Sequence, residues 1–204
     1  MNATSLRTRL IAAAALACAA AAPAYAGDFM VRGRVLQLDP ANQNTADAVI
    51  TTDSVSVNTK YIWEIDASYF VTQNVALELI ATTPQKQTVT SSQLGKLGTL
   101  RHLPPTLTAQ YHFAPTNPVA RPYVGFGVNY THFSAVNLGG LDIDRHSWGT
   151  AVQLGADFPI TDKVSLNVDF KKIDIRTRVY SGTTQLGTVK VDPVLFGIGI
   201  GYRF

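Results

Sequence analysis

The feature that most constrains this chain is a period-two alternation of apolar and polar side chains, which recurs in segment after segment from residue 28 to the C-terminus. Residues 59–70 show it most clearly. Successive side chains of a β-strand point to opposite faces, so this alternation predicts a strand with one apolar face. In 59–70 the apolar face comprises Tyr61, Trp63, Ile65, Ala67 and Tyr69, and the opposite face includes Lys60, Glu64, Asp66 and Ser68.

Eight such segments follow one another, at 28–38, 59–70, 75–84, 103–113, 121–134, 147–158, 164–179 and 191–204. Their connections alternate in length, being long at 39–57, 85–102, 135–146 and 180–190 and short at 71–74, 114–120 and 159–163. Long outer loops and short periplasmic turns are typical of bacterial outer-membrane barrels. We therefore expect an all-β fold over 27–204: an eight-stranded antiparallel transmembrane β-barrel with a narrow lumen.

The first 26 residues have a different character. Arg7 and Arg9 precede an apolar run at 10–22, which Pro23 and small residues at 24–26 follow. This arrangement predicts a cleaved secretory signal peptide and export toward the outer membrane of a Gram-negative cell. Cys18 lies inside it, so the mature chain is expected to have neither disulfides nor thiol chemistry.

Composition favours a membrane barrel over a soluble domain. Only 15% of the 204 residues are charged, against about 25% in a typical soluble domain, while 46% are hydrophobic. No apolar run after residue 26 is long enough for a membrane helix, and a closed barrel is the other fold that pairs all its backbone groups within a bilayer. The alternative is a soluble β-sandwich or lipocalin-like barrel, in which the apolar face would point inward. With Arg7 and Arg9 removed, the basic excess is too small to suggest a nucleic-acid partner.

The interior is expected to hold both charged and apolar side chains. A cation facing lipid near the midplane costs about 2–4 kcal/mol, so the face that carries Arg32 and Arg34 should point inward. The predicted lumen charges are Arg32, Arg34, Glu64, Asp66 and Glu78, and the predicted apolar lumen or gate residues are Met30, Leu36, Ile62, Ile80 and Leu195. An apolar collar above the charges would admit an apolar solute that cannot continue to the periplasm; alternatively, these residues simply fill the barrel.

Two further patterns mark the strand ends. In 164–179 the apolar parity flips after Lys171 and Lys172, which either a bulge or emergence from the bilayer would explain. Aromatic residues gather at expected interfaces, as outer-membrane barrels require. The inner set is Tyr69, Phe70, Phe113, Phe158, Tyr202 and Phe204, and the outer set is Tyr61, Trp63, Tyr130, Phe133 and Trp148.

The last strand ends in an aromatic residue. Phe204, with Tyr202 two residues before it and Gly199 upstream, resembles the signal by which the barrel assembly machinery of the outer membrane recognises its clients. That machinery is an expected partner.

Three prolines lie in or at the mouths of the expected strands, namely Pro104, Pro105 and Pro193. Proline cannot donate a hydrogen bond to a ladder, and a closed barrel has no edge on which to place it. One hypothesis is that the prolines open the wall for lateral release of an apolar molecule into the membrane. The alternative is that they end their strands above the membrane.

Several blocks of this chain resemble the outer membrane protein W family. The most specific is Leu-Pro-Pro-Thr-Leu-Thr-Ala-Gln-Tyr-His-Phe at 103–113, followed by Arg-Pro-Tyr-Val-Gly-Phe-Gly-Val-Asn-Tyr-Thr at 121–131; 76–84, Asp192-Pro193 and 201–204 also match. The resemblance covers 27–204 and is weakest at 39–57 and 135–146. It implies a monomeric eight-stranded barrel with a narrow, partly hydrophobic interior and uptake of small hydrophobic solutes. It also implies stress-response or phage and colicin receptor roles in some members.

Three functions are therefore weighed. The first is a porin-like channel for small hydrophobic molecules, surrounded by outer-membrane lipids and lipopolysaccharide. The second is a surface structural or receptor barrel for phage, colicin or host contact, which would bind through loops 39–57 and 85–102. The third is a lipid A esterase using His132 and Ser134, with Asp142 or Asp144 as orienter. No metal spacing joins the four histidines, and neither catalysis nor a cofactor is expected.

Overall fold

The computed structural model describes residues 28–40, 43–45, 55–57, 59–91 and 95–204. The expected signal peptide and much of loop 39–57 lie outside these residues. Within them, no helix has the length and apolar character needed to span a membrane.

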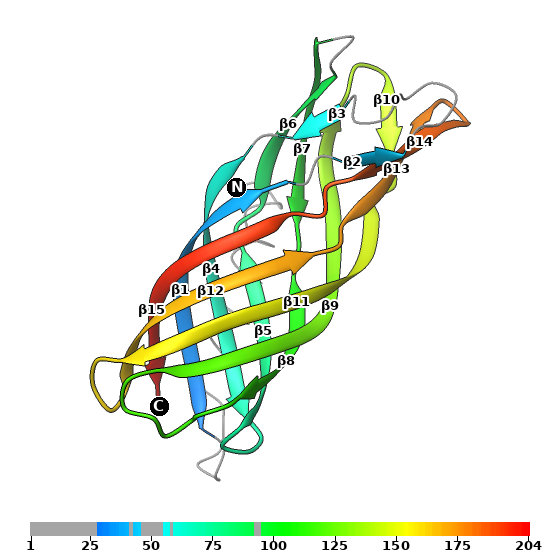
Figure 1. Ribbon diagram of the computed structural model, residues 1–204. Helices are drawn as coiled ribbons and strands as arrows, with labels where there is room; N and C mark the ends of the chain where they lie inside the picture. The colour runs from blue at the N-terminus through cyan, green and yellow to red at the C-terminus, as the bar shows by residue number, and fades with distance from the viewer. Residues whose placement is uncertain (1–27, 41–42, 46–54, 58, 92–94) are drawn as a thin grey trace, which may run out of the picture.

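Eight antiparallel strands form a closed barrel, as the alternation predicted (Figure 1). In ring order they are β1 (Phe29–Asp39), β4 (Lys60–Phe70), β5 (Val75–Thr82), β8 (Thr106–His112), β9 (Arg121–Asn137), β11 (His146–Pro159), β12 (Val164–Ile173) and β15 (Val194–Arg203). The first and last strands pair with each other, from Met30 opposite Arg203 to Asp39 opposite Val194, and this pairing closes the ring.

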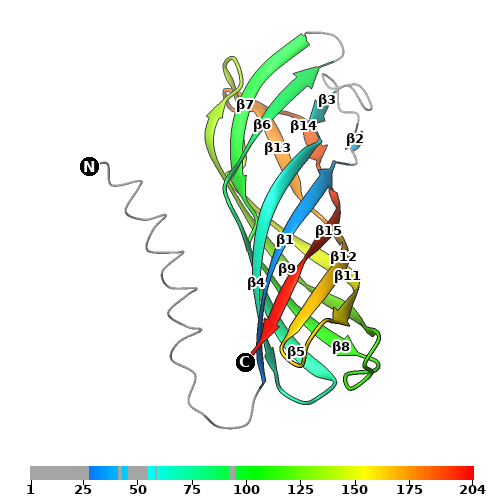
Figure 2. The same ribbon diagram turned by 90° about the vertical axis from the view of Figure 1, so that its left-hand side faces the viewer.

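The remaining strands lie at the end of the barrel opposite the C-terminus (Figure 1). They are β2 (Gln43–Thr45), β3 (Val55–Val57), β6 (Gln85–Ser91), β7 (Gly95–Leu103), β10 (Leu141–Ile143), β13 (Arg176–Ser181) and β14 (Thr184–Lys190). The segments expected as long loops at 85–102 and 180–190 are thus largely paired strands. β6 and β7 rise beyond the barrel strands as a hairpin, and β7 stays bonded to β9 (Figure 2).

The wall has its apolar side chains on the outside. Trp63, Phe126 and Ile198 are 70%, 61% and 50% exposed, whereas Arg32 and Arg34 are fully buried. A soluble barrel would show the reverse, so the soluble alternative is wrong. Such an outer surface is stable against hydrocarbon and not against water.

The parity flip at 164–179 has a simple origin. β12 ends at Ile173, and β13 begins only at Arg176, so the expected single strand to 179 is wrong. Inward and outward positions nevertheless alternate without interruption from Lys171 through Val179. What changes is the environment of the outward side chains. Val168 and Phe170 belong to the band of apolar side chains around the outer wall, which we call the apolar belt, whereas Lys172, Arg176 and Arg178 lie above it and are charged. Emergence from the bilayer therefore explains the flip, and no bulge interrupts β12.

Two of the expected interface aromatics are misplaced. Phe70 and Phe133 are only 4% and 2% exposed, so both point into the barrel. The other inner and outer aromatics lie on the outer surface, half-buried to exposed. Phe70 ends an inward series in β4, where a ring can pack against side chains of the lumen.

Candidate functional site in the barrel interior

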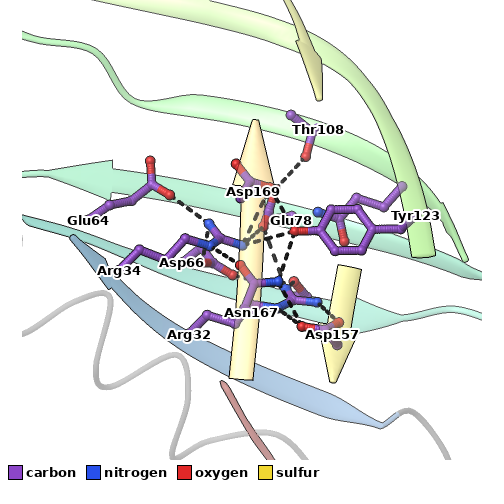
Figure 3. Close-up of polar contacts among 12 residues, drawn as sticks. Arg32, Arg34, Glu64, Asp66, Glu78, Thr108, Tyr123, Asp157, Asn167 and Asp169 are labelled. Atoms are coloured by element: carbon purple, nitrogen blue, oxygen red, sulfur yellow. Dashed lines mark hydrogen bonds and ion pairs between the residues drawn. The ribbon is translucent and has the colours of Figure 1, made fainter. Parts of the chain in front are cut away.

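The middle of the lumen is filled by a charge cluster, which we define as Arg32, Arg34, Lys171, Glu64, Asp66, Glu78, Asp157 and Asp169 (Figure 3 shows all but Lys171 with labels). Every member is 4% exposed or less. These charges come from β1, β4, β5, β11 and β12, and they meet because each inward position of a narrow barrel faces the axis.

Arg34 is the most connected cation of the cluster. Its Nη1 lies 2.6 Å from Glu64 Oε1 and 2.7 Å from Asp66 Oδ2, and its Nη2 lies 3.4 Å from Glu78 Oε1. Lys171 Nζ contacts Glu64 at 2.6 Å and Asp169 at 3.1 Å. Charges removed from water need such partners, since each unpaired one would cost several kcal/mol.

Neutral groups complete the cluster. The Tyr123 hydroxyl donates to Asp169 Oδ2 at 2.7 Å, Thr108 Oγ1 donates to Glu78 Oε2 at 2.9 Å, and Asn167 Nδ2 donates to Asp157 Oδ1 at 2.8 Å (Figure 3). The Arg32 guanidinium lies over the Tyr123 ring, 5.3 Å from the ring centre. The cluster and these neutral partners thus form one hydrogen-bonded layer across the middle of the lumen.

An apolar collar lies on the loop side of this layer. We define it as Leu36, Leu38, Ile62, Ile80, Ile173, Ile175 and Leu195, all buried. A narrow pocket, with room for about one water molecule, runs among collar residues, and Pro104 and Pro193 form part of its lining. Glu64 and Thr106 also line it, so the pocket reaches from the collar to the charge cluster.

The wall beside Pro104 lacks ladder pairing. The β5–β8 ladder ends at Ile80 opposite Thr106, and the next pair across is Gln85 with His102, in β6 and β7. Among these described residues, no backbone hydrogen bond joins 81–84 to 103–105. The carbonyl of Pro105 accepts from Tyr130 N of β9 at 3.0 Å. The N–H and C=O of a strand residue point to the same neighbouring strand. The backbone of Pro105 therefore faces β9, and the backbone of Pro104 faces the unpaired gap toward residues 81–84.

Pro193 removes one ladder donor from the wall on the other side of the lumen. Its carbonyl accepts from Ile173 N at 3.1 Å, so its missing N–H would have faced β12. Pro104 and Pro193 both precede a barrel strand, and both lie beside the collar rather than in the middle of the apolar belt.

The far end of the lumen contains a separate apolar cluster of Met30, Phe70 and Ala76. The His112 ring lies 4.9 Å from the Phe70 ring, and the Arg203 guanidinium lies 4.3 Å from the same ring centre. Met30 was expected in the collar. It belongs instead to this cluster, because it stands at the opposite end of β1 from Leu36 with Arg32 and Arg34 between them.

The ten predicted lumen residues are all buried inside the barrel. The sequence reasoning missed Asp157, Asp169, Lys171 and Tyr123 as members or partners of the cluster. A usable signal was present: Asp169 and Lys171 alternate with outward Val168 and Phe170, and period two alone places them inside. The roles of all these residues stay predictions.

The esterase residues lie on the outer rim, on the loop side of the apolar belt. His132 Nδ1 contacts His146 Nδ1 at 3.3 Å. Asp142 pairs with Arg145, and Asp144 pairs with Arg178 and accepts from Tyr180. Both carboxylates are thus paired with arginines rather than with His132.

Another histidine near the collar is buried. His102 lies on β7, opposite Phe133 of β9 and at the level of the rim residue His132, and is 5% exposed. Burial, with a smaller contribution from the charge of Lys60, lowers the pKa of His102 to about 4. The side chain is therefore neutral at physiological pH.

The residues predicted as an assembly signal, Gly199, Tyr202 and Phe204, lie at the end of the chain, on both faces of the wall. Tyr202 and Phe204 point outward with ring centres 5.0 Å apart. Gly199 faces inward, where a Cβ would lie 2.1 Å from the carbonyl oxygen of Gly33. Close packing of β15 on β1 is thus one reason for glycine at this position.

A comparison with protein families decides the classification, since the model of the OmpW family matches residues 25–204. The chain belongs to the OmpW family. Outer membrane protein W of Vibrio cholerae is 33% identical over 211 residues, covering 94% of this chain and 96% of that protein. The crystal structure of OprG from Pseudomonas aeruginosa, at 30% identity, superposes with a TM-score of 0.75 over 88% of this chain and 96% of that one.

A third relative has a more informative name. The dibenzothiophene metabolism operon protein PahQ of Pseudomonas aeruginosa is 34% identical over 115 residues, covering 53% of this chain and 54% of that protein. Together, the family and the barrel place this OmpW-family protein in the outer membrane.

Proposed function

We propose that this barrel takes up small hydrophobic molecules from outside the cell and releases them sideways into the outer membrane. The solute enters at the loop end, pushes apart the collar side chains, whose pocket otherwise has room for about one water molecule, and stops at the charge cluster. The observation that carries the proposal is this order of layers, in which an apolar pocket ends on a closed layer of paired charges.

The alternative reading, in which the collar merely fills the barrel, accounts less well for the wall beside it. Both interruptions of the wall lie at residues that line the collar pocket, Pro104 and Pro193. An apolar molecule in the collar is therefore adjacent to places where fewer hydrogen bonds have to break for strands to separate. The PahQ relative, named for an operon of dibenzothiophene metabolism, supports an apolar aromatic class of solute.

The test compares uptake of a labelled polycyclic aromatic solute in cells that express single and double variants. Pro104→Ala and Pro193→Ala each supply the missing ladder donor and should slow uptake, and the double variant should reduce it to the level of cells without the protein. Pro118→Ala is the control, because Pro118 is exposed in the short 114–120 connection at the other end of the barrel and belongs to no ladder.

A second variant tests the collar itself. Ile80→Asp puts a charge into the pocket and should abolish uptake while the barrel still migrates as a folded species in unheated gels. If the double proline variant and Ile80→Asp both take up solute at the wild-type rate, the proposed function is wrong.

A further inference from the structure

Two histidines from different strands meet on the outer rim of the barrel. His132 of β9 and His146 of β11 are directly opposite in the ladder, both rings are exposed, and their centres are 4.9 Å apart. The two Nδ1 atoms are separated by 3.3 Å. In the sequence these residues are 14 positions apart and show no metal-binding spacing.

A third polar atom converges on the same place. The Tyr130 hydroxyl lies 2.5 Å from His146 Nδ1, and the Tyr130 ring stacks on the His146 ring with centres 5.6 Å apart. The Trp148 ring centre also lies 4.8 Å from the Tyr130 ring centre. The strands thus hold Tyr130, His132 and His146 in one compact cluster.

His146 Nδ1 has two polar neighbours in this cluster. A ring nitrogen has either one proton or one lone pair, so His146 Nδ1 must share it between Tyr130 and His132. The nearby carboxylates of Asp142 and Asp144 are engaged with Arg145 and Arg178 and provide no counter-ion. A cation between the three atoms would use every lone pair that points there.

We propose that Tyr130, His132 and His146 bind a divalent transition-metal ion of the zinc and copper class. Imidazole nitrogens bind Zn²⁺ at about 2.0–2.1 Å, and a tetrahedral angle then separates two such nitrogens by about 3.3 Å. That value equals the 3.3 Å between His132 Nδ1 and His146 Nδ1. The Tyr130 hydroxyl, 2.5 Å from His146 Nδ1, would have to move outward by about 1 Å to join them as a third ligand. Two imidazoles and a phenol suit Zn²⁺, Ni²⁺ and Cu²⁺, whereas Mg²⁺ and Ca²⁺ prefer oxygen-only sites.

The ion would act as a clamp at the outer end of the β9–β11 ladder. His132 and His146 are the last pair of that ladder before the β10 excursion, at Leu141–Ile143. Binding to the folded barrel and not to the unfolded chain stabilises the folded state in proportion to the logarithm of ion concentration. The proposal does not depend on solute uptake.

The experiment uses the mature protein without a histidine tag, refolded in detergent and freed of metal by a chelator. Cu²⁺ is titrated with calorimetric detection, and electron paramagnetic resonance reports the ligand atoms. We expect one Cu²⁺ per barrel, with splitting from two nitrogens. His132→Ala and His146→Ala should each weaken binding by at least about tenfold, and Zn²⁺ but not Mg²⁺ should raise the unfolding temperature of the wild type.

Two variants complete the design. Ser134→Ala, on the same strand as His132, is the matched control and should bind Cu²⁺ like the wild type. Tyr130→Phe should lose affinity, and unchanged affinity would remove tyrosine from the ligand set. All these side chains are on the outer rim, so the barrel should fold in each variant. Equal Cu²⁺ binding by the wild type and by the double His132→Ala, His146→Ala variant would overturn the proposal.

Discussion

Arg32 and Asp157 form a two-pronged ion pair across the lumen. Arg32 Nε lies 3.0 Å from Asp157 Oδ1, and Nη2 lies 2.8 Å from Oδ2. Their strands, β1 and β11, are not neighbours in the ring, because β12 and β15 stand between them. The pair therefore links two parts of the wall that no backbone ladder joins.

Removing one partner of this pair should strongly destabilise the barrel. Asp157→Ala leaves a buried guanidinium without its bidentate acceptor, and we expect a loss of about 3–5 kcal/mol in the free energy of unfolding, measured by urea titration in lipid vesicles. Arg145→Ala breaks an exposed pair with Asp142 and should cost less than about 1 kcal/mol. Similar losses in the two variants would contradict a structural role for the charge cluster.

The charge cluster should also determine ion conduction. Arg34→Ala removes the cation that contacts Glu64, Asp66 and Glu78 and leaves a hydrated, negative space in its place. In planar bilayers, single-channel conductance should rise several-fold and become cation-selective. Wild-type conductance in this variant would show that the cluster is not the barrier.

A charge on the outer wall should cost free energy according to its depth. Ile198 lies in the middle of β15 and is 50% exposed, so Ile198→Arg should destabilise the barrel by about 2–4 kcal/mol in a bilayer. Tyr61→Arg places the same charge near the outer end of β4 and should cost about 0–1 kcal/mol. The free energy of unfolding of both variants is measured by titration in vesicles. Equal losses in Ile198→Arg and Tyr61→Arg would mean that Ile198 does not lie deeper in the membrane than Tyr61.

Two glycines in neighbouring strands provide a matched test of packing. A Cβ at Gly199 would lie 2.1 Å from the Gly33 carbonyl oxygen, whereas a Cβ at Gly33 would meet nothing within 4 Å. Gly199→Ala should therefore destabilise the barrel by about 1–3 kcal/mol and lower its yield in the outer membrane. Gly33→Ala should leave both unfolding and yield unchanged, and a defect there would argue against close approach as the cause.

His102 should give the barrel a defined acid sensitivity. Its pKa in the folded protein is about 4 and that of an unperturbed histidine about 6.5, so the unfolded chain binds the additional proton between these values. Neutral His102 makes its full contribution to the free energy of unfolding above about pH 6.5. This contribution decreases as the pH falls toward 4, by about 3 kcal/mol in total.

The measurement is the unfolding free energy at pH 7 and pH 5. His102→Phe should remove this part of the pH dependence, and His132→Ala, at an exposed site, should retain it. An unchanged pH dependence in His102→Phe would show that other groups are responsible.

Much of the architecture follows from the sequence alone, because period-two patterning is a local property. The alternation at 59–70 and 191–204 is sufficient to show which side chains face out, and the cost of a cation in lipid is sufficient to turn Arg32 and Arg34 inward. Loop lengths then determine which end carries the extensions. These are nearest-neighbour rules, and they require no knowledge of which strands meet.

The tertiary structure alone decided what meets inside and on the rim. Which carboxylate binds Arg32, whether Met30 belongs to the collar, and that His132 touches His146 all depend on register and on axial height, and both are set when the ring closes. Such contacts join residues 125 positions apart in Arg32 and Asp157, and 133 positions apart in Arg34 and Asn167. No local pattern encodes them, because every inward residue of a narrow barrel has several candidate partners around the axis.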